Sequence, residues 1–175
     1  MKGILFRQEL IKAIVEGRKT VSRRAMKPQP HNEKGVMRWQ PRKGIDINME
    51  HLNPSLINSY AKYQVGEVVY LKETLFRHPY LNEAGYVLDE TPVFINQTIG
   101  DCLKWRWSKD ILPSMFMPQE AARYHIRIKG VRAERLELPL SPDELEREGG
   151  EAALPMLTLI DGKWVWRYSF EKASQ

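Results

Sequence analysis

The residues best suited to chemistry lie close together in residues 17–24, which read GRKTVSRR. An amine, a hydroxyl and a guanidinium occur there at short spacing, on Lys19, Ser22 and Arg24. A guanidinium can donate two parallel hydrogen bonds to a phosphate or to a base edge. Positive neighbours disfavour the protonated form of a lysine, and a neutral amine can activate a nearby hydroxyl as a nucleophile. The segment therefore predicts a phosphate-binding site or part of a hydrolytic site.

The local structure expected for this segment is a β-strand, because β-branched residues alternate with others over residues 20–24. In a strand, Ser22 and Arg24 point to one face and Arg23 to the other. We expect these side chains to line a cleft together with Lys19. An alternative stays open, in which the arginines are solvated and the hydroxyls bond only to nearby backbone.

Composition indicates a globular chain without a membrane span. Of the 175 residues, 42% are hydrophobic, and no apolar run approaches the roughly 20 residues that a spanning helix needs. The first residues, MKGILFRQE, do not resemble a signal peptide, and Cys102 is the single cysteine. We expect a cytoplasmic protein with no cofactor and no structural metal, since the four histidines are scattered. A Mg²⁺ ion held mainly by water and substrate stays compatible with the sequence.

Charge is distributed unevenly along the chain. Residues 1–45 hold 12 basic and 3 acidic side chains, a net charge of +9, whereas the whole chain has +5 and the remainder therefore −4. A basic segment of this kind suits the phosphates of RNA or of a nucleotide. The alternative is a solvated surface that only maintains solubility.

The pattern of expected elements predicts an α+β fold with short helices and many short strands. Apolar residues at helical spacing indicate a helix over residues 8–16, which Gly17 ends. Ser141 followed by Pro142 indicates the start of a second helix, which runs to Gly149. The expected strands are residues 4–6, 68–73, 124–128, 131–136 and 164–170.

Several segments together resemble the activating-signal-cointegrator homology (ASCH) domains of the PUA-like superfamily, in particular the longer type encoded by phages and prophages. The resemblance implies a mixed β-barrel with short flanking helices and an ordered insertion. It also implies a single domain over residues 1–175, with insertions at about 25–62 and 78–104. The segments that carry it are ILF at 4–6, IVEGRKTVSRR at 14–24, YQVGEVVYLKET at 63–74, PSMFMP at 113–118 with AR at 122–123, and WVW at 164–166 with FE at 170–171.

The same resemblance implies an enzymatic activity. Small ASCH enzymes that remove the acetyl group from N4-acetylcytidine use a lysine, a threonine and a glutamate. By motif these roles fall on Lys19, on Ser22, where the hydroxyl is kept, and on Glu148 rather than Glu146. Serine attack on the acyl carbon would be assisted by the lysine as base. Ribonuclease action at the same cluster is a related alternative.

The function we expect first is binding of RNA or of a modified nucleotide. A hydrolase using Lys19, Ser22 and Glu148 is the second hypothesis, and a phage-encoded protein that binds an acidic host partner is the third. We expect Glu73 to be a buried structural partner of Arg24 or Arg23. The residues expected to contact phosphates or bases are Arg18, Thr20, Arg23, Arg24, Trp39 and Arg123.

Overall fold

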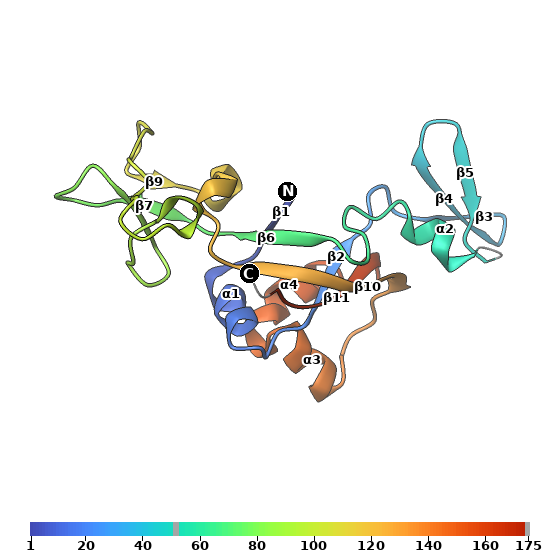
Figure 1. The fold of residues 1–175 in the computed structure, drawn as a ribbon. Helices are drawn as coiled ribbons and strands as arrows, with labels where there is room; N and C mark the ends of the chain where they lie inside the picture. Colours follow the sequence, from blue (N-terminus) through green and yellow to red (C-terminus); the bar gives the residue numbers. More distant parts are fainter. Residues whose placement is uncertain (51–52, 174–175) are drawn as a thin grey trace. The chain divides into compact units, whose positions relative to one another are not determined.

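The computed structural model describes residues 1–50 and 53–173, which divide into two compact units (Figure 1). Unit 1 comprises residues 1–15, 68–127 and 172–173 of the described chain, and unit 2 comprises residues 16–50, 53–67 and 128–171. Each unit is therefore built from segments far apart in the sequence. The expectation of a single domain over 1–175 stays a prediction.

Unit 1 is organised around strand β6, Val68–Lys72. β6 pairs in parallel with β1, Gly3–Leu5, and antiparallel with the first residues of β10, His125–Arg135. Helix α1, Gln8–Val15, follows β1 and buries its apolar side, as the helical spacing predicts. The buried residues of α1 are Leu10, Ile11, Ala13 and Ile14.

A second sheet in unit 1 has the strand order β8-β7-β9. These strands are short, and the burial of an apolar cluster that includes Leu75, Tyr86, Trp105 and Met117 stabilises this part of the unit. Three single-turn 3₁₀ helices complete the unit. The bounds are β7 Leu75–Arg77, β8 Ala84–Tyr86, β9 Ile111–Leu112, η1 Ile95–Gln97, η2 Ser114–Phe116 and η3 Gln119–Ala121.

Unit 2 contains the strands that carry the candidate site. β2, Val21–Ala25, pairs antiparallel with β11, Trp164–Lys172, and β11 is the neighbour of β10 in the strand order β10-β11-β2. Arg23 and Arg167 are directly opposite each other in the register. β10 is a single strand in which the two strands expected over 124–128 and 131–136 are joined.

The insertion expected over residues 25–62 is ordered in its described part and forms a three-stranded antiparallel sheet and a short helix. The hairpin between β3 and β4 turns at Lys34 and Gly35, whose φ angles of 52° and 88° belong to the tight turn that favours glycine. The bounds are β3 His31–Glu33, β4 Val36–Arg42, β5 Ile45–Asn48 and α2 Pro54–Asn58.

Helix α3, Pro142–Glu148, begins and ends where the sequence predicts. The hydroxyl of Ser141 accepts a hydrogen bond from the backbone N–H of Glu144 at 3.3 Å, and Gly149 ends the helix with a φ of 109°. The 3₁₀ helix η4, Gly150–Ala153, and helix α4, Leu154–Leu159, follow directly. α3 lies against β2, so its last residue comes close to the start of that strand.

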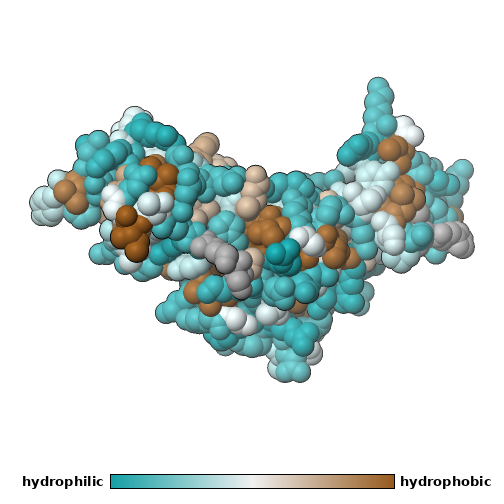
Figure 2. Space-filling model, viewed as in Figure 1, coloured by the Kyte–Doolittle hydropathy of each residue, from teal (hydrophilic) through white to brown (hydrophobic). Residues whose placement is uncertain are grey.

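The expectation of a mixed α and β chain is confirmed, whereas a closed barrel is not found among residues 1–50 and 53–173. The sheets β3-β4-β5 and β8-β7-β9 are separate from the sheet that contains β10 and β11, so the strands do not close into one barrel. Every helix in the described part of the chain is too short or too polar to cross a lipid bilayer. On the face drawn in Figure 2, hydrophilic residues predominate and hydrophobic residues form separate patches.

The buried phenol of Tyr168 gives unit 2 a predicted sensitivity to alkali. Burial raises the pKa of Tyr168 to about 12, from 10.0. Because the pKa of Tyr168 is higher in the folded than in the unfolded state, its protonated phenol contributes to the free energy of unfolding. This contribution is fully present below pH 10 and is lost as the pH rises through 12. Tyr168→Phe should therefore weaken the alkaline loss of stability by up to about 3 kcal/mol, measured by urea denaturation between pH 8 and 12.

Tyr80→Phe is the matched control, because the side chain of Tyr80 lies in solvent with 90% exposure. This variant should follow the wild-type pH curve. Identical curves for wild type and Tyr168→Phe would contradict the assignment to Tyr168.

Candidate functional site

The centre of the candidate site is a buried pair formed by Lys19 and Glu148. Lys19 Nζ lies 3.1 Å from Glu148 Oε2, and the two residues are 3% and 2% exposed. The ammonium also donates to the backbone carbonyls of Glu148 and Val21, the latter at 2.6 Å. The backbone positions this pair, because the N–H of Thr20 donates to the carbonyl of Arg147 at 2.9 Å and joins the start of β2 to the end of α3.

Arg23 holds the carboxylate of this pair from the other side. Its Nη1 donates to Glu148 Oε1 at 3.0 Å, so the two oxygens of Glu148 each face a different cation. The same guanidinium donates through Nε to Glu134 at 2.7 Å and through Nη2 to Glu144 at 3.0 Å. We call the three glutamates around Arg23 the carboxylate cluster. All three guanidinium nitrogens of Arg23 are therefore occupied.

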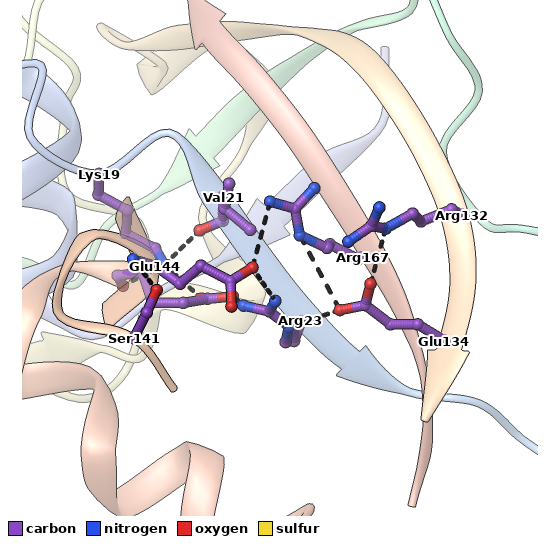
Figure 3. Close-up of polar contacts among 9 residues, drawn as sticks. Lys19, Val21, Arg23, Arg132, Glu134, Ser141, Glu144 and Arg167 are labelled. Carbon is purple, nitrogen blue, oxygen red and sulfur yellow. Dashed lines mark hydrogen bonds and ion pairs between the residues drawn. The ribbon is translucent and has the colours of Figure 1, made fainter. Parts of the chain in front are cut away.

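Two further arginines lie on the side of the carboxylate cluster away from Lys19, which we call its outer side (Figure 3). Arg132 of β10 donates through Nε to Glu134 Oε2 at 2.6 Å. Arg167 of β11 makes only long ion pairs, with Nε 3.9 Å from Glu134 and Nη2 3.8 Å from Glu144. Side-chain exposure therefore increases across the site, from the buried pair of Lys19 and Glu148 to the partly exposed arginines at the outer side.

The surroundings of Lys19 favour the neutral form of its amine more than water does. Burial lowers the pKa of Lys19, and the charges of Arg24 and Arg23 lower it further, while Glu148 acts in the opposite direction and offsets only part of this effect. A buried amine with a lowered pKa gives up its proton at a lower pH than an ordinary lysine does. Groups perturbed in this way are typical of functional sites.

Ser22 and Arg24 lie on β2, as predicted, on the face opposite Arg23. Ser22 is buried at 5% exposure and faces Tyr168 across the strand pair, whereas Arg24 is partly buried and faces Trp166. Burial lowers the pKa of Arg24. The cleft expected around these residues stays a prediction.

Arg18 and Thr20 lie next to Lys19 in the sequence, and neither contributes a side-chain contact to the Lys19–Glu148 pair that the structure records. Arg18 is exposed and donates through Nε to Glu16 at 2.9 Å. Thr20 contributes its backbone, since its carbonyl also accepts from the N–H of Phe170 at 2.9 Å. Arg23, expected to hold phosphate, has its nitrogens engaged by glutamates instead, which makes it a positioning residue in this structure.

Trp39 is placed differently from the expectation that it stacks on a base. Its ring is 2% exposed and packs edge-on against Tyr60 and Trp166, each at 5.6 Å between ring centroids. The indole N–H donates to the carbonyl of Pro28 at 2.9 Å. Trp39 is therefore a core residue between the insertion and β11, with no face open to a base.

Arg123 and Glu73 form a separate cluster in unit 1. Arg123 donates through Nε and Nη2 to the two oxygens of Glu73 at 2.9 and 2.8 Å, and through Nη1 to Asp89 at 2.7 Å. Its guanidinium lies over the ring of Tyr86 at 3.7 Å. Burial opposes the charge of Arg123, but the bonds to Glu73 and Asp89 outweigh burial and raise its pKa. The partner of Glu73 is thus Arg123, in place of the expected Arg24 or Arg23.

Glu134 and Glu144 of the carboxylate cluster, and the outer arginines, were not anticipated from the sequence. One local signal was available, because Glu144 and Glu148 are four residues apart on a helix and therefore share a face. Arg132 and Glu134 are two residues apart on a strand and also share a face. Nothing local indicates that these two faces meet at Arg23.

No group of His, Cys, Asp and Glu side chains within residues 1–50 and 53–173 is arranged to hold a metal ion. The three glutamates of the carboxylate cluster face guanidinium groups instead. Comparison of the chain with protein-family models, with curated proteins and with solved structures finds no match.

The buried pair gives a direct stability prediction. Glu148→Gln should lower the free energy of unfolding by about 3 kcal/mol, because it leaves Lys19 and one nitrogen of Arg23 buried without a countercharge. Glu146→Gln is the matched control on the same helix, since the side chain of Glu146 is 57% exposed. Urea denaturation measures both variants, and equal losses in the two would show that the pair is not specifically stabilising.

Proposed function

We propose that unit 2 is a hydrolase of acylated nucleosides, with Lys19 and Glu148 as its proton-transfer pair. The observation that carries this proposal is the buried contact between Lys19 Nζ and Glu148, with Arg23 fixing the second carboxylate oxygen. Enclosing two opposite charges gives little net stability, because desolvation offsets most of their attraction. An arrangement that lowers a lysine pKa is of direct use in acid–base chemistry.

The proposed reaction removes an acetyl group from the exocyclic nitrogen of a cytosine. Neutral Lys19 accepts the proton of Ser22, and the serine oxygen forms a bond to the acetyl carbon. The bond from that carbon to the cytosine nitrogen breaks, and the lysine returns its proton to that nitrogen. Water then cleaves the acetyl-serine ester and releases acetate, while Glu148 orients the lysine and relays the proton.

The family and fold proposed for this chain follow from the sequence resemblance. We propose an ASCH domain with PUA-like strand arrangement, on the segments around residues 14–24 and 63–74. The order of helix α1, then a lysine, a hydroxyl and an arginine leading along β2, supports this proposal. The single cysteine, Cys102, supports a reducing, cytoplasmic setting.

The hydrolase proposal is tested by acetate release from N4-acetylcytidine. Lys19→Ala and Ser22→Ala should each lower kcat/KM by about 10³-fold, a typical loss for a missing proton acceptor or nucleophile. Lys19→Arg should be equally inactive, because an arginine stays protonated at every accessible pH. The wild-type rate should rise with pH to a plateau, with an apparent pKa below the ordinary lysine value of 10.5.

Lys43→Ala controls for the loss of a positive charge, because Lys43 is exposed on the insertion. It should retain wild-type activity. Full acetate release by the folded Lys19→Ala variant would overturn the proposal. Loss with Lys19→Ala but not with Ser22→Ala would instead assign the attack to water.

The second candidate function is binding of RNA, favoured by the exposed lysines of the insertion. Lys27, Lys34 and Lys43 lie exposed on and beside the sheet β3-β4-β5. Ammonium groups in such positions bind phosphates through their charge, and this attraction weakens with added salt because the release of counterions then gains less free energy.

Replacing Lys27, Lys34 and Lys43 together by Gln should weaken binding of single-stranded RNA. The slope of log affinity against log salt should become shallower by about 0.7 for each phosphate that the variant no longer neutralises. Fluorescence anisotropy at several salt concentrations measures this slope. Ser22→Ala and Lys109→Gln should keep the wild-type slope, and an unchanged slope in the triple variant would exclude the insertion as the surface that binds RNA.

A further inference from the structure

The guanidinium of Arg167 makes only long ion pairs in the described part of the chain. Its Nε makes no hydrogen bond within residues 1–50 and 53–173, and its ion pairs to Glu134 and Glu144 are 3.9 and 3.8 Å long. Its side chain is 15% exposed, so water only partly replaces the missing bonds. A largely enclosed guanidinium without a close acceptor is costly to keep.

Arg132 presents further donors beside Arg167. Within the described residues its Nε alone is hydrogen bonded, to Glu134 at 2.6 Å, and its side chain is 59% exposed. The two guanidinium groups approach Glu134 from neighbouring strands, β10 and β11 (Figure 3). Their mutual repulsion contributes to the pKa of Arg167, which burial lowers and the charges of Arg132 and Arg23 lower further.

The charges of the whole network do not cancel. While Lys19 is protonated, four cations face the three glutamates of the carboxylate cluster, which leaves one positive charge in excess; the cations are Lys19, Arg23, Arg132 and Arg167. Glu148 is shared by Lys19 and Arg23, and Glu144 accepts a hydrogen bond from Arg23. The excess charge therefore resides at the outer side, where Arg132 and Arg167 stand.

We propose that Arg132 and Arg167 bind the phosphate of a nucleotide substrate, so that the enzyme acts on phosphorylated acylcytidines in preference to the free nucleoside. This inference rests on the proposed hydrolase function and assigns its substrate class. Two guanidinium groups with open donors match the oxygens of a phosphate, and their positive charges attract it.

Arg23 connects this phosphate site to the proposed reaction site. The same guanidinium contacts Glu148 at 3.0 Å and Glu144 at 3.0 Å, and Glu144 in turn faces Arg167. The phosphate site and the Lys19 pair are therefore separated by one arginine side chain. In the proposed complex the phosphate contacts Arg132 and Arg167, and the base points toward Lys19.

The test compares kcat/KM for N4-acetylcytidine 5′-monophosphate with kcat/KM for N4-acetylcytidine. Wild type should prefer the nucleotide by at least tenfold. Arg167→Gln and Arg132→Gln should each reduce this preference severalfold, and the double variant should bring the ratio close to one. A purely structural role would lower both rates and leave the ratio unchanged, and such a result would overturn the proposal.

Two further variants test the source of the preference for the nucleotide. Arg167→Lys separates the charge from the geometry of the donors, and Lys129→Gln is a control outside the network. A lysine keeps the charge but loses the fork of donors, so Arg167→Lys should restore only part of the preference. Lys129 lies exposed on β10 and pairs with Glu171 at 3.3 Å, outside the network. Its Gln variant should keep the full wild-type ratio.

Binding of cytidine 5′-monophosphate, followed by isothermal titration calorimetry, separates failure of this inference from failure of the proposed function. The inactive Lys19→Ala variant should still bind the nucleotide more tightly than cytidine, and Arg132→Gln/Arg167→Gln should lose that difference. Nucleotide binding that depends on both arginines, without any hydrolysis, would support the phosphate site and refute the hydrolase. Hydrolysis with no preference for phosphate and no effect of the arginines would refute the phosphate site alone.

Discussion

The guanidinium of Arg23 is the constraint on which the candidate site depends. It is a positive charge at 8% exposure, and a charge in that position must be neutralised by close acceptors. Glu134 from β10 and Glu144 and Glu148 from α3 supply them, at 2.7–3.0 Å. One side chain thereby ties β2 to a strand and to a helix. Because the buried charge of Arg23 must be neutralised, Glu148 is held beside it, and this position also determines the environment of Lys19.

Glu148 is shared by two cations, and this sharing explains why Lys19 is unusual. One oxygen faces Arg23 and the other faces Lys19, so the carboxylate cannot neutralise either cation fully. Burial therefore dominates at Lys19 and lowers its pKa, despite a carboxylate 3.1 Å away. The same competition extends outward, where Arg167 is left with contacts longer than hydrogen bonds.

The arginine cluster of unit 1 shows what a satisfied arrangement of similar residues looks like. Arg123 has close acceptors for its Nε and both Nη nitrogens, on Glu73, Asp89 and the hydroxyl of Thr91, and lies against the ring of Tyr86. Its bonds outweigh the cost of burial, and its pKa is raised. This is the behaviour of a structural network. The contrast with Lys19 and Arg167 is the reason why the chemistry that we propose is placed in unit 2.

The sequence by itself determined the local elements and the residue types of the site. Helical spacing predicted α1, the alternation after Gly17 predicted β2, and Ser141 fixed the start of α3, because caps, turns and periodicity act within a few residues. The family resemblance added the expectation that Lys19 acts together with Glu148. Only the tertiary structure decided that Trp39 is buried, that the described strands form separate sheets in place of a closed barrel, and that Arg23 contacts glutamates 111–125 residues away. Contacts at such separation depend on how faces pack, and no local pattern encodes which faces meet.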